Sequence, residues 1–256
     1  MKRLLKVAGV VLALLVVAVG GLLAVTFMGR RPLTDGQDVN GIRIVADGFS
    51  SVAVIAVNDR QVALVDAGED QAGEAIKREL ERRQLQPSAV AAILLTHGHP
   101  DHTAALTQFP GAEVMALEAE VPLIEGRSGA KGPLPRFFPV SVTGITVDRV
   151  LHDGDVVMLG SSRVRVYAVP GHTAGSAAYF VNGVLLVGDS ADVSSDGNLQ
   201  GSPWIFSDNQ ADNRTSLVRL EQQLVRDGAK VTAIVPSHSG TAGGLAPLTA
   251  FARGNE

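Results

Sequence analysis

A short run of metal-binding side chains follows a strongly apolar segment in the first half of the chain. The segment over residues 89–96 reads AVAAILLT, and the overlapping run THGHPDH contains His97, His99, Asp101 and His102. An apolar run of this length, bounded by turn residues, is typical of a buried strand. Imidazole and carboxylate groups suit zinc, so the pattern predicts a metal site at the carboxyl edge of a buried sheet.

The spacing within this run predicts two neighbouring metals. In a turn after a strand, the alternate residues His97 and His99 can point toward one metal. Asp101 and His102 stand one turn into a helix that Pro100 can begin, so they can reach a second metal. Four such side chains within six positions are poorly explained by ordinary packing.

Two further histidines share one local pattern. His172 in VPGHTAGS and His238 in VPSHSG each follow an apolar strand, a proline and a small residue, and a glycine-containing turn comes next. Alone, each would be interpreted as a surface or capping residue, but beside the first run we predict that both are metal ligands. His152 in LHDGD lacks the preceding proline, and we predict a structural or solvent-facing role for it.

Two aspartates also end predicted strands. Asp189 in LLVGDS is predicted to bridge two cations, because a carboxylate has two oxygens and an imidazole cannot bridge. Asp66 in LVDAG is predicted to orient a ligand and brace its loop rather than to bind metal directly. The chain contains no cysteine, which excludes thiolate ligands and disulfides.

Taken in order, LVDAG, THGHPDH, PGHTAGS, GDS and PSHSG, spread over residues 64–240, resemble the five motifs of the metallo-β-lactamase-fold superfamily. The resemblance implies a four-layer αββα sandwich with its metal site at one edge between the two sheets. The ligand set that it implies is His97, His99 and His172 for the first metal, Asp101, His102 and His238 for the second, and Asp189 as the bridge between them.

A metal pair of this kind favours hydrolysis. Two metals about 3.5–4 Å apart can lower the pKa of a bridging water far enough to supply hydroxide near neutral pH, and Asp101 can shuttle the proton. We predict two zinc ions per chain, with iron and manganese as alternatives, and a small-molecule substrate. A mononuclear-iron sulfur dioxygenase stays open, because some relatives hold one iron with the ligands that match the first cluster and Asp189.

Asp189 also narrows the substrate class. True zinc β-lactamases of the superfamily generally lack an aspartate bridge there, whereas glyoxalase II-like thioesterases, lactonases and phosphodiesterases have one. We therefore expect a lactone, ester, thioester or similar substrate, with β-lactam and phosphodiester hydrolysis as alternatives. Only 18 residues follow His238, so we expect no C-terminal helical region of the glyoxalase II type and do not expect glutathione thioesters.

The N-terminal segment has the length of a membrane span. Residues 7–29 carry no charge, and as a helix they would extend about 34 Å, against about 30 Å for a hydrocarbon core. Lys2, Arg3 and Lys6 precede the run, so the positive-inside rule predicts a cytoplasmic N-terminus and an extracytoplasmic domain, periplasmic or at the cell exterior. A cleaved signal sequence, which would give a secreted protein, is the alternative.

We therefore divide the chain into an anchor over residues 1–31, a linker over 32–40 and a hydrolase domain over 41–256. Residues 32–256 hold 17 of the 22 basic residues and all 26 acidic ones, a net charge of −9. So acidic a domain is not expected to bind nucleic acid. The substrate, the native metal and the oligomeric state are not specified by the sequence.

Alternation and apolar runs predict the secondary structure. We predict helices over residues 69–83 and 213–226. The predicted strands cover residues 42–45, 52–57, 62–65, 89–96, 144–150, 156–159, 164–169, 177–181, 184–187 and 231–235. Strand clusters with helices between and after them indicate an α/β layered sandwich.

Two segments are candidate walls of a substrate pocket. Residues 125–139 read EGRSGAKGPLPRFFP and form a predicted loop, in which Phe137 and Phe138 could instead fill the core. The segment SPWIF over residues 202–206 contains the only tryptophan, Trp204, which could either line an acyl pocket or pack under its loop.

Overall fold

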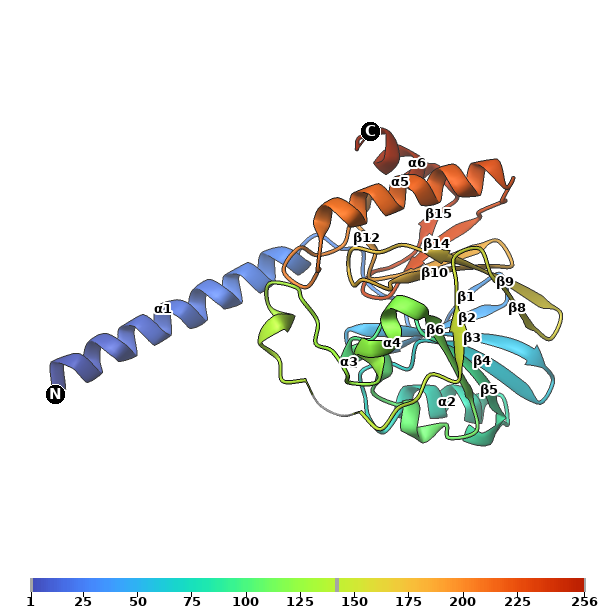
Figure 1. Cartoon of the computed structure of the whole chain (residues 1–256), viewed down its shortest axis with the longest axis horizontal. Helices are drawn as coiled ribbons and strands as arrows, with labels where there is room; N and C mark the ends of the chain where they lie inside the picture. Colours follow the sequence, from blue (N-terminus) through green and yellow to red (C-terminus); the bar gives the residue numbers. More distant parts are fainter. Residues whose placement is uncertain (1, 141–142, 256) are drawn as a thin grey trace. The chain divides into compact units, whose positions relative to one another are not determined.

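The computed structural model describes residues 2–140 and 143–255, although several side chains in the N-terminal helix lie outside the description (Figure 1). Helix α1 covers Lys2–Phe27. The chain divides into two compact units, one ending at Arg30 and the other beginning at Arg31. The second unit contains all of the strands in the described residues.

Within the described part of the chain, no helix is both long enough and apolar enough to cross a membrane. The predicted span over residues 7–29 therefore gains no support from the structure. Several of its side chains belong to the part of α1 that is not described.

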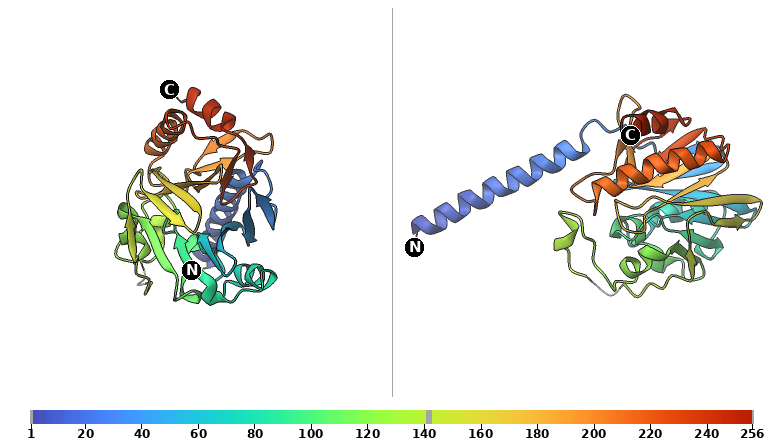
Figure 2. Two further views of the ribbon diagram at one scale, coloured as in Figure 1. Left: turned by 90° about the vertical axis from the view of Figure 1, so that its right-hand side faces the viewer. Right: turned by 45° about the horizontal axis from the view of Figure 1, so that its top comes forward.

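Two β-sheets face each other in the second unit (Figures 1 and 2). The first has the strand order β1-β2-β3-β4-β5-β6-β7, and the second has the order β15-β14-β11-β10-β9-β8. The strands of the first sheet are β1 Gln37–Val39, β2 Ile42–Asp47, β3 Ser50–Asn58, β4 Gln61–Val65, β5 Val90–Leu94, β6 Glu113–Leu117 and β7 Arg149–Leu151. Those of the second are β8 Val156–Leu159, β9 Ser162–Ala168, β10 Ala177–Val181, β11 Val184–Gly188, β14 Ala233–Pro236 and β15 Ala242–Gly243, and β12 Ala191–Val193 pairs separately with β13 Leu199–Gly201.

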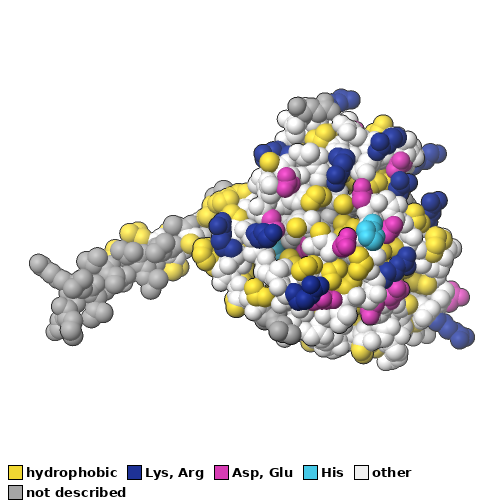
Figure 3. Space-filling model, in the orientation of Figure 1, with side chains coloured by type: hydrophobic (Ala, Val, Ile, Leu, Met, Phe, Trp, Pro, Cys, Tyr) yellow, Lys and Arg dark blue, Asp and Glu magenta, His cyan; other side chains and the backbone are white. Residues whose placement is uncertain are grey.

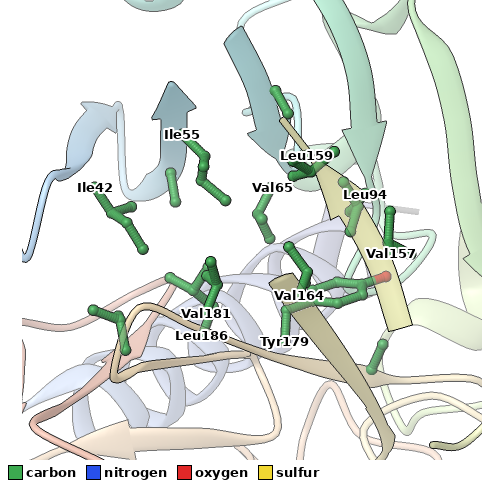
Figure 4. Packing of buried hydrophobic residues seen from close by; sticks show 14 of the residues in the cluster. Ile42, Ile55, Val65, Leu94, Val157, Leu159, Val164, Tyr179, Val181 and Leu186 are labelled. Atoms are coloured by element: carbon green, nitrogen blue, oxygen red, sulfur yellow. The ribbon is translucent and has the colours of Figure 1, made fainter. Parts of the chain in front are cut away.

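The strands are apolar on both faces, which explains why both faces of each sheet are covered. In β3, Ala53 and Ile55 join the core between the sheets, whereas Val52 and Val54 belong to the cluster on the outer face. Successive side chains of a strand point to opposite faces, so one strand supplies two hydrophobic layers. Figure 4 shows the central layer, in which apolar side chains of the two sheets interdigitate.

Helices cover the outer faces of both sheets. Helix α2 (Glu74–Arg82) packs Ile76 against the first sheet, and α5 (Gln210–Arg226) packs Leu220 against the second, where α6 (Ala246–Arg253) joins it. Figures 1 and 2 show α2 and α5 on opposite sides of the sheet pair. The prediction of an αββα sandwich is confirmed. The shorter helices are η1 Pro87–Ala89, α3 Pro100–Thr103, η2 Leu106–Gln108, η3 Glu118–Glu120, α4 Val121–Ile124 and η4 Pro135–Phe137.

Most predicted strands and helices match observed ones, but the predicted strand over residues 144–150 is largely wrong, because β7 begins only at Arg149. Hydrogen bonds to the end of α4 and to the residue after it hold this stretch instead. Thr143 Oγ1 donates to the Ile124 carbonyl (2.9 Å), and the Val147 N–H donates to the Glu125 carboxylate (3.2 Å). Strand β6 was not predicted.

The helix predicted over residues 69–83 begins five residues late, at Glu74. The Asp47 carboxylate accepts hydrogen bonds from the N–H groups of Glu69 (2.7 Å) and Asp70 (2.9 Å), which holds these residues in a turn. Gly73 then precedes the helix with a left-handed φ of 63°, a conformation that glycine adopts without steric cost. A contact with a distant side chain therefore decides where α2 starts.

Parallel strand pairs bring the candidate ligands to one edge of the sandwich. β4 pairs in parallel with β5, so Asp66 and His97 follow strand ends that lie side by side. β11 pairs in parallel with β14, and Asp189 and His238 follow those two ends in the same way. The carboxyl ends of parallel strands meet at the same sheet edge, where open α/β sheets usually bind ligands.

Candidate metal centre

The first cluster consists of His97, His99 and His172, whose ring nitrogens converge on one point. His97 Nε2 lies 3.1 Å from His99 Nδ1, and His172 Nε2 lies 3.2 Å from His97 Nε2 and 3.0 Å from His99 Nδ1. Two of these histidines come from the loop after β5 and the third from the loop after β9. All three side chains are buried.

The three nitrogens have the spacing of metal ligands. Tetrahedral zinc with Zn–N bonds of about 2.0–2.1 Å would separate its nitrogens by about 3.3 Å. The nitrogens on the far side of two rings face hydroxyl groups, His97 Nδ1 with Thr96 Oγ1 (3.1 Å) and His172 Nδ1 with Ser207 Oγ (3.2 Å). A ring proton on those nitrogens leaves Nε2 free to bind a cation.

Burial keeps the first cluster neutral. Burial lowers the pKa of His172 to about 3 and also lowers the pKa of His99. The pKa of His97 is lowered more strongly, because the nearby His102 and His172 add to the effect of burial. Metal binding requires unprotonated imidazole. The three rings are therefore ready to bind a cation at neutral pH without first losing a proton.

The second cluster combines two histidines with two aspartates. His238 Nε2 lies 3.2 Å from Asp101 Oδ2 and 2.9 Å from Asp189 Oδ2. His102 Nε2 lies 3.3 Å from Asp189 Oδ1 and 3.6 Å from Asp101 Oδ2. One ligand atom from each of the four residues lies within 4.8 Å of the others.

Asp189 lies between the two clusters. Its Oδ2 is 3.5 Å from His172 Nε2 of the first cluster and 2.9 Å from His238 Nε2 of the second. Three buried polar atoms here, Asp189 Oδ1, His102 Nε2 and His99 Nε2, make no well-aligned hydrogen bond among the described residues, although the first two lie 3.3 Å apart as an ion pair. Buried polar atoms normally have partners, and a cation would supply one for the atoms of the second cluster. The donor set thus fits divalent metal, with Asp189 able to contact two ions.

The second cluster is charged where the first is neutral. Burial alone would lower the pKa of His238, but the Asp189 carboxylate and hydrogen bonds to Asp101 and Asp189 raise it to about 10. Burial would likewise raise the pKa of Asp101, but His102 and His238 lower it strongly. Asp189, Asp101 and Asp66 together raise the pKa of the buried His102. Opposite charges within hydrogen-bond range account for all of these shifts.

Asp66 orients His102 from behind. Its Oδ2 lies 2.8 Å from His102 Nδ1, and its two oxygens accept hydrogen bonds from the Thr96 N–H (2.7 Å) and hydroxyl (2.8 Å). The contact places the His102 proton on Nδ1 and directs Nε2 toward Asp101 and Asp189. A carboxylate behind a metal-binding histidine fixes its tautomer and its orientation.

Sequence reasoning missed the β2–β3 turn, which contacts the second cluster. His238 Nδ1 donates to the Phe49 carbonyl (2.8 Å), and the two rings stack with centroids 5.6 Å apart. Ser50 Oγ donates to the Asp101 carbonyl (3.1 Å). The turn sequence DGFS at residues 47–50 carries no signal of this role, because the contacts join residues up to 189 positions apart.

Sequence reasoning also missed Glu120, at the end of η3. Burial raises the pKa of its carboxyl to about 7. It accepts hydrogen bonds from the loops that carry His97, His99 and His172. An acidic residue after an apolar strand is common in sequences, so no local pattern marks it.

The remaining candidates lie at the surface. His152 has a side chain 63% exposed, in agreement with the solvent-facing alternative. Phe137 and Phe138 are 78% and 51% exposed and do not fill the core, and Trp204 is half exposed rather than packed under its loop. Residues 131–134 do contact residues 205–208, through the Leu134 N–H and Ile205 carbonyl among others.

Little histidine is visible on the face drawn in Figure 3, where basic and acidic side chains are interspersed. In the second cluster, the Asp101 side chain is 22% exposed, against 7% for His238, 6% for Asp189 and 0% for His102. The accessible side of the centre is therefore the side of Asp101.

Comparisons with known proteins agree on one family. A family model described as the metallo-β-lactamase superfamily matches residues 45–238. The chain is 29% identical over 174 residues to a hydroxyacylglutathione hydrolase of Cronobacter sakazakii, covering 65% of this chain and 57% of that protein. It is 31% identical over 170 residues to the hydroxyacylglutathione hydrolase of Maricaulis maris, covering 65% and 54%. The chain thus spans little more than half the length of these relatives.

Solved structures share the fold. A subclass B3 metallo-β-lactamase of Bradyrhizobium japonicum superposes with a TM-score of 0.58 at 22% identity, covering 84% of this chain and 81% of that chain. A metallo-β-lactamase family protein of Thermus thermophilus gives 0.58 at 22% identity, covering 84% and 79%. A B3 metallo-β-lactamase described as having an active-site glutamic acid gives 0.65 at 19% identity, covering 91% and 90%.

Proposed function

This chain belongs to the metallo-β-lactamase superfamily, and we propose that it is a metallohydrolase that uses two zinc ions to hydrolyse a thioester, lactone or ester. The observation that carries the proposal is the position of Asp189 between two sets of metal donors. The ligands proposed for the first zinc are His97, His99 and His172, those for the second are Asp101, His102 and His238, and Asp189 would contact both ions.

Two bound zinc ions would lower the pKa of water toward 7 and polarise the carbonyl that is attacked. The protein contributes the arrangement around them. Asp189 is deeply buried and held ionised by His238 and His102, which suits a permanent ligand. The Asp101 side chain is 22% exposed, and His102 and His238 lower its pKa so strongly that it is a weak base, so we assign it first as a ligand of the second zinc.

Thioesters are the first substrates to examine. The curated relatives are hydroxyacylglutathione hydrolases, although this chain spans little more than half of their length. Phe49 is largely exposed and stacks on His238, so an apolar surface borders the accessible side of the centre. This surface suits the acyl part of a substrate.

The test is a turnover screen of the purified full-length protein with zinc supplied. Lactones, aryl esters and simple thioesters are expected to be hydrolysed. Hydroxyacylglutathione tests the substrate named for the relatives, which the sequence did not favour, and β-lactams and phosphodiesters represent the competing assignments. Protein treated with a chelator and protein carrying Asp189→Ala are the controls. Turnover that does not require zinc, or the absence of turnover on every thioester, lactone and ester, contradicts the proposal. One iron per chain after native purification favours the dioxygenase instead.

We further propose that residues 7–29 anchor the protein in a membrane, with the hydrolase domain outside the cytoplasm. The support is the sequence alone, 23 uncharged residues preceded by three basic ones. Because the chain has no cysteine, Asp59→Cys introduces a single thiol in the exposed β3–β4 turn. A membrane-impermeant maleimide should label it in intact cells but should not label Lys6→Cys. Labelling of Lys6→Cys but not of Asp59→Cys, or extraction of the protein by alkaline carbonate, contradicts the proposed anchor.

A further inference from the structure

A short segment, residues 119–124, lies between the two loops that carry the first cluster. It comprises the end of η3 and all of α4, directly after strand β6. One of the loops contains His97 and His99, and the other contains His172. We propose that Glu120 is a positioning residue that holds these two loops at a fixed separation and thereby sets the metal affinity of the first cluster.

Hydrogen bonds from both loops meet on the Glu120 carboxylate. Oε1 accepts from the N–H of Gly98, at 2.7 Å, and Gly98 lies between His97 and His99 in the chain. Oε2 accepts from the N–H of Gly175, at 2.8 Å, and from the hydroxyl of Thr173, at 2.9 Å. Because Glu120 is only 1% exposed, it connects the loops without competition from water.

Close packing against the same segment supports this role. A Cβ atom at Gly98 would lie 3.0 Å from the backbone nitrogen of Ile124, and a Cβ atom at Gly175 would lie 2.3 Å from that of Glu120. Each loop therefore has a glycine where it touches residues 119–124. Such an approach needs the absence of a side chain, so both loops rest on the segment by backbone contact.

The geometry of the cluster makes the separation of the loops important. His172 Nε2 reaches both His99 Nδ1 and His97 Nε2 across the boundary between the loops. Metal–ligand distances tolerate changes of only about 0.2 Å. A carboxylate can accept from both loops because each of its oxygens is an acceptor, whereas the amide of glutamine has one acceptor oxygen and would place an NH₂ group against an N–H donor.

The proposal rests on the assignment of His97, His99 and His172 as metal ligands. The test is therefore made in full-length protein carrying His238→Ala, in which the second cluster is impaired and the first can be titrated. Zinc affinity is measured by competition with a chromophoric chelator, and cobalt(II) absorption reports the ligand geometry. Glu120→Gln should weaken binding by about 10–100-fold, the range for partners behind metal ligands, and alter the cobalt spectrum.

A matched control is Glu79→Gln. Glu79 is also a buried carboxylate, but its partners are Arg43, Arg82 and Arg83. Its substitution should destabilise folding without changing zinc affinity or the cobalt spectrum. Thr173→Val removes one of the three donors to Glu120 and should weaken zinc binding severalfold, which provides a milder test if Glu120→Gln does not fold.

Wild-type zinc affinity and cobalt spectrum in both the Glu120→Gln and Thr173→Val proteins would overturn the positioning role. Equal losses in Glu120→Gln and Glu79→Gln would also overturn it, since they would indicate a general effect of removing a buried charge. Failure of the proposed function gives a different result, because the parent protein itself would then bind no metal at the first cluster.

Discussion

The two clusters of candidate metal ligands consist of different donors and carry different charge. The first consists of three imidazoles, and burial lowers the pKa of each of them. The second alternates imidazole and carboxylate, and the mutual attraction of His102 and His238 with Asp101 and Asp189 favours their charged forms. A cation enters the first cluster without displacing a proton, but in the second it must replace protons already held there.

Asp189 connects the clusters, so its removal should have the largest effect. Asp189→Ala takes a ligand from both metals and should lower kcat/KM by about 10³-fold or more, which corresponds to several kcal/mol of transition-state stabilisation. The check is steady-state kinetics together with metal analysis. Asp59→Ala, in the exposed β3–β4 turn, is the control and should behave as wild type. Two tightly bound zinc ions in Asp189→Ala would show that the clusters are independent.

Single-histidine variants separate the clusters from each other. His238→Ala should retain one zinc ion per chain because the first cluster stays complete, whereas His172→Ala should lose the ion of the first cluster. Both should lose at least about 90% of hydrolysis if both metals act on one substrate. Metal analysis after gel filtration measures the count. If His238→Ala kept full activity, the second cluster would have no part in the reaction.

The role of Asp66 in orienting His102 of the second cluster can be tested by substitution. Asp66→Asn removes the negative charge 2.8 Å from His102 Nδ1, and Asp66→Ala removes the partner altogether. Zinc affinity at the second cluster should fall by about 10–100-fold, while that of the first should change little. Chelator competition would resolve the two binding steps. An equal loss at both clusters would instead indicate collapse of the shared sheet edge, because Asp66 also binds Thr96.

The charge difference predicts a pH dependence. Asp189 and its neighbours raise the pKa of His238 to about 10 despite burial, whereas burial lowers that of His172 to about 3. Between about pH 6 and 9, zinc affinity of the second cluster should therefore rise about tenfold per pH unit for each proton displaced, and that of the first should stay nearly constant. Titration calorimetry in buffers of different ionisation enthalpy counts the released protons. Release of the same number of protons when zinc binds the first and the second cluster would contradict the difference in charge between them.

The sequence predicted which candidate ligands come together better than it predicted their surroundings. The seven candidate ligands all follow predicted strands or begin a predicted helix, and the structure brings all seven together in two groups. Continuous apolar runs located most strands, because both sheets are buried on both faces. Alternation placed a strand over residues 144–150, where contacts with Ile124 and Glu125 prevail instead.

By itself, the sequence determined which side chains can bind metal and that strands present them, because ligand chemistry and alternation are local properties. The tertiary structure decided how these side chains are supported. Phe49 meets His238 and Glu120 meets Gly175 only through the packing of segments that are 189 and 55 positions apart. The same packing buries three imidazoles together and sets two others against carboxylates, so the charge of each cluster is a property of the fold.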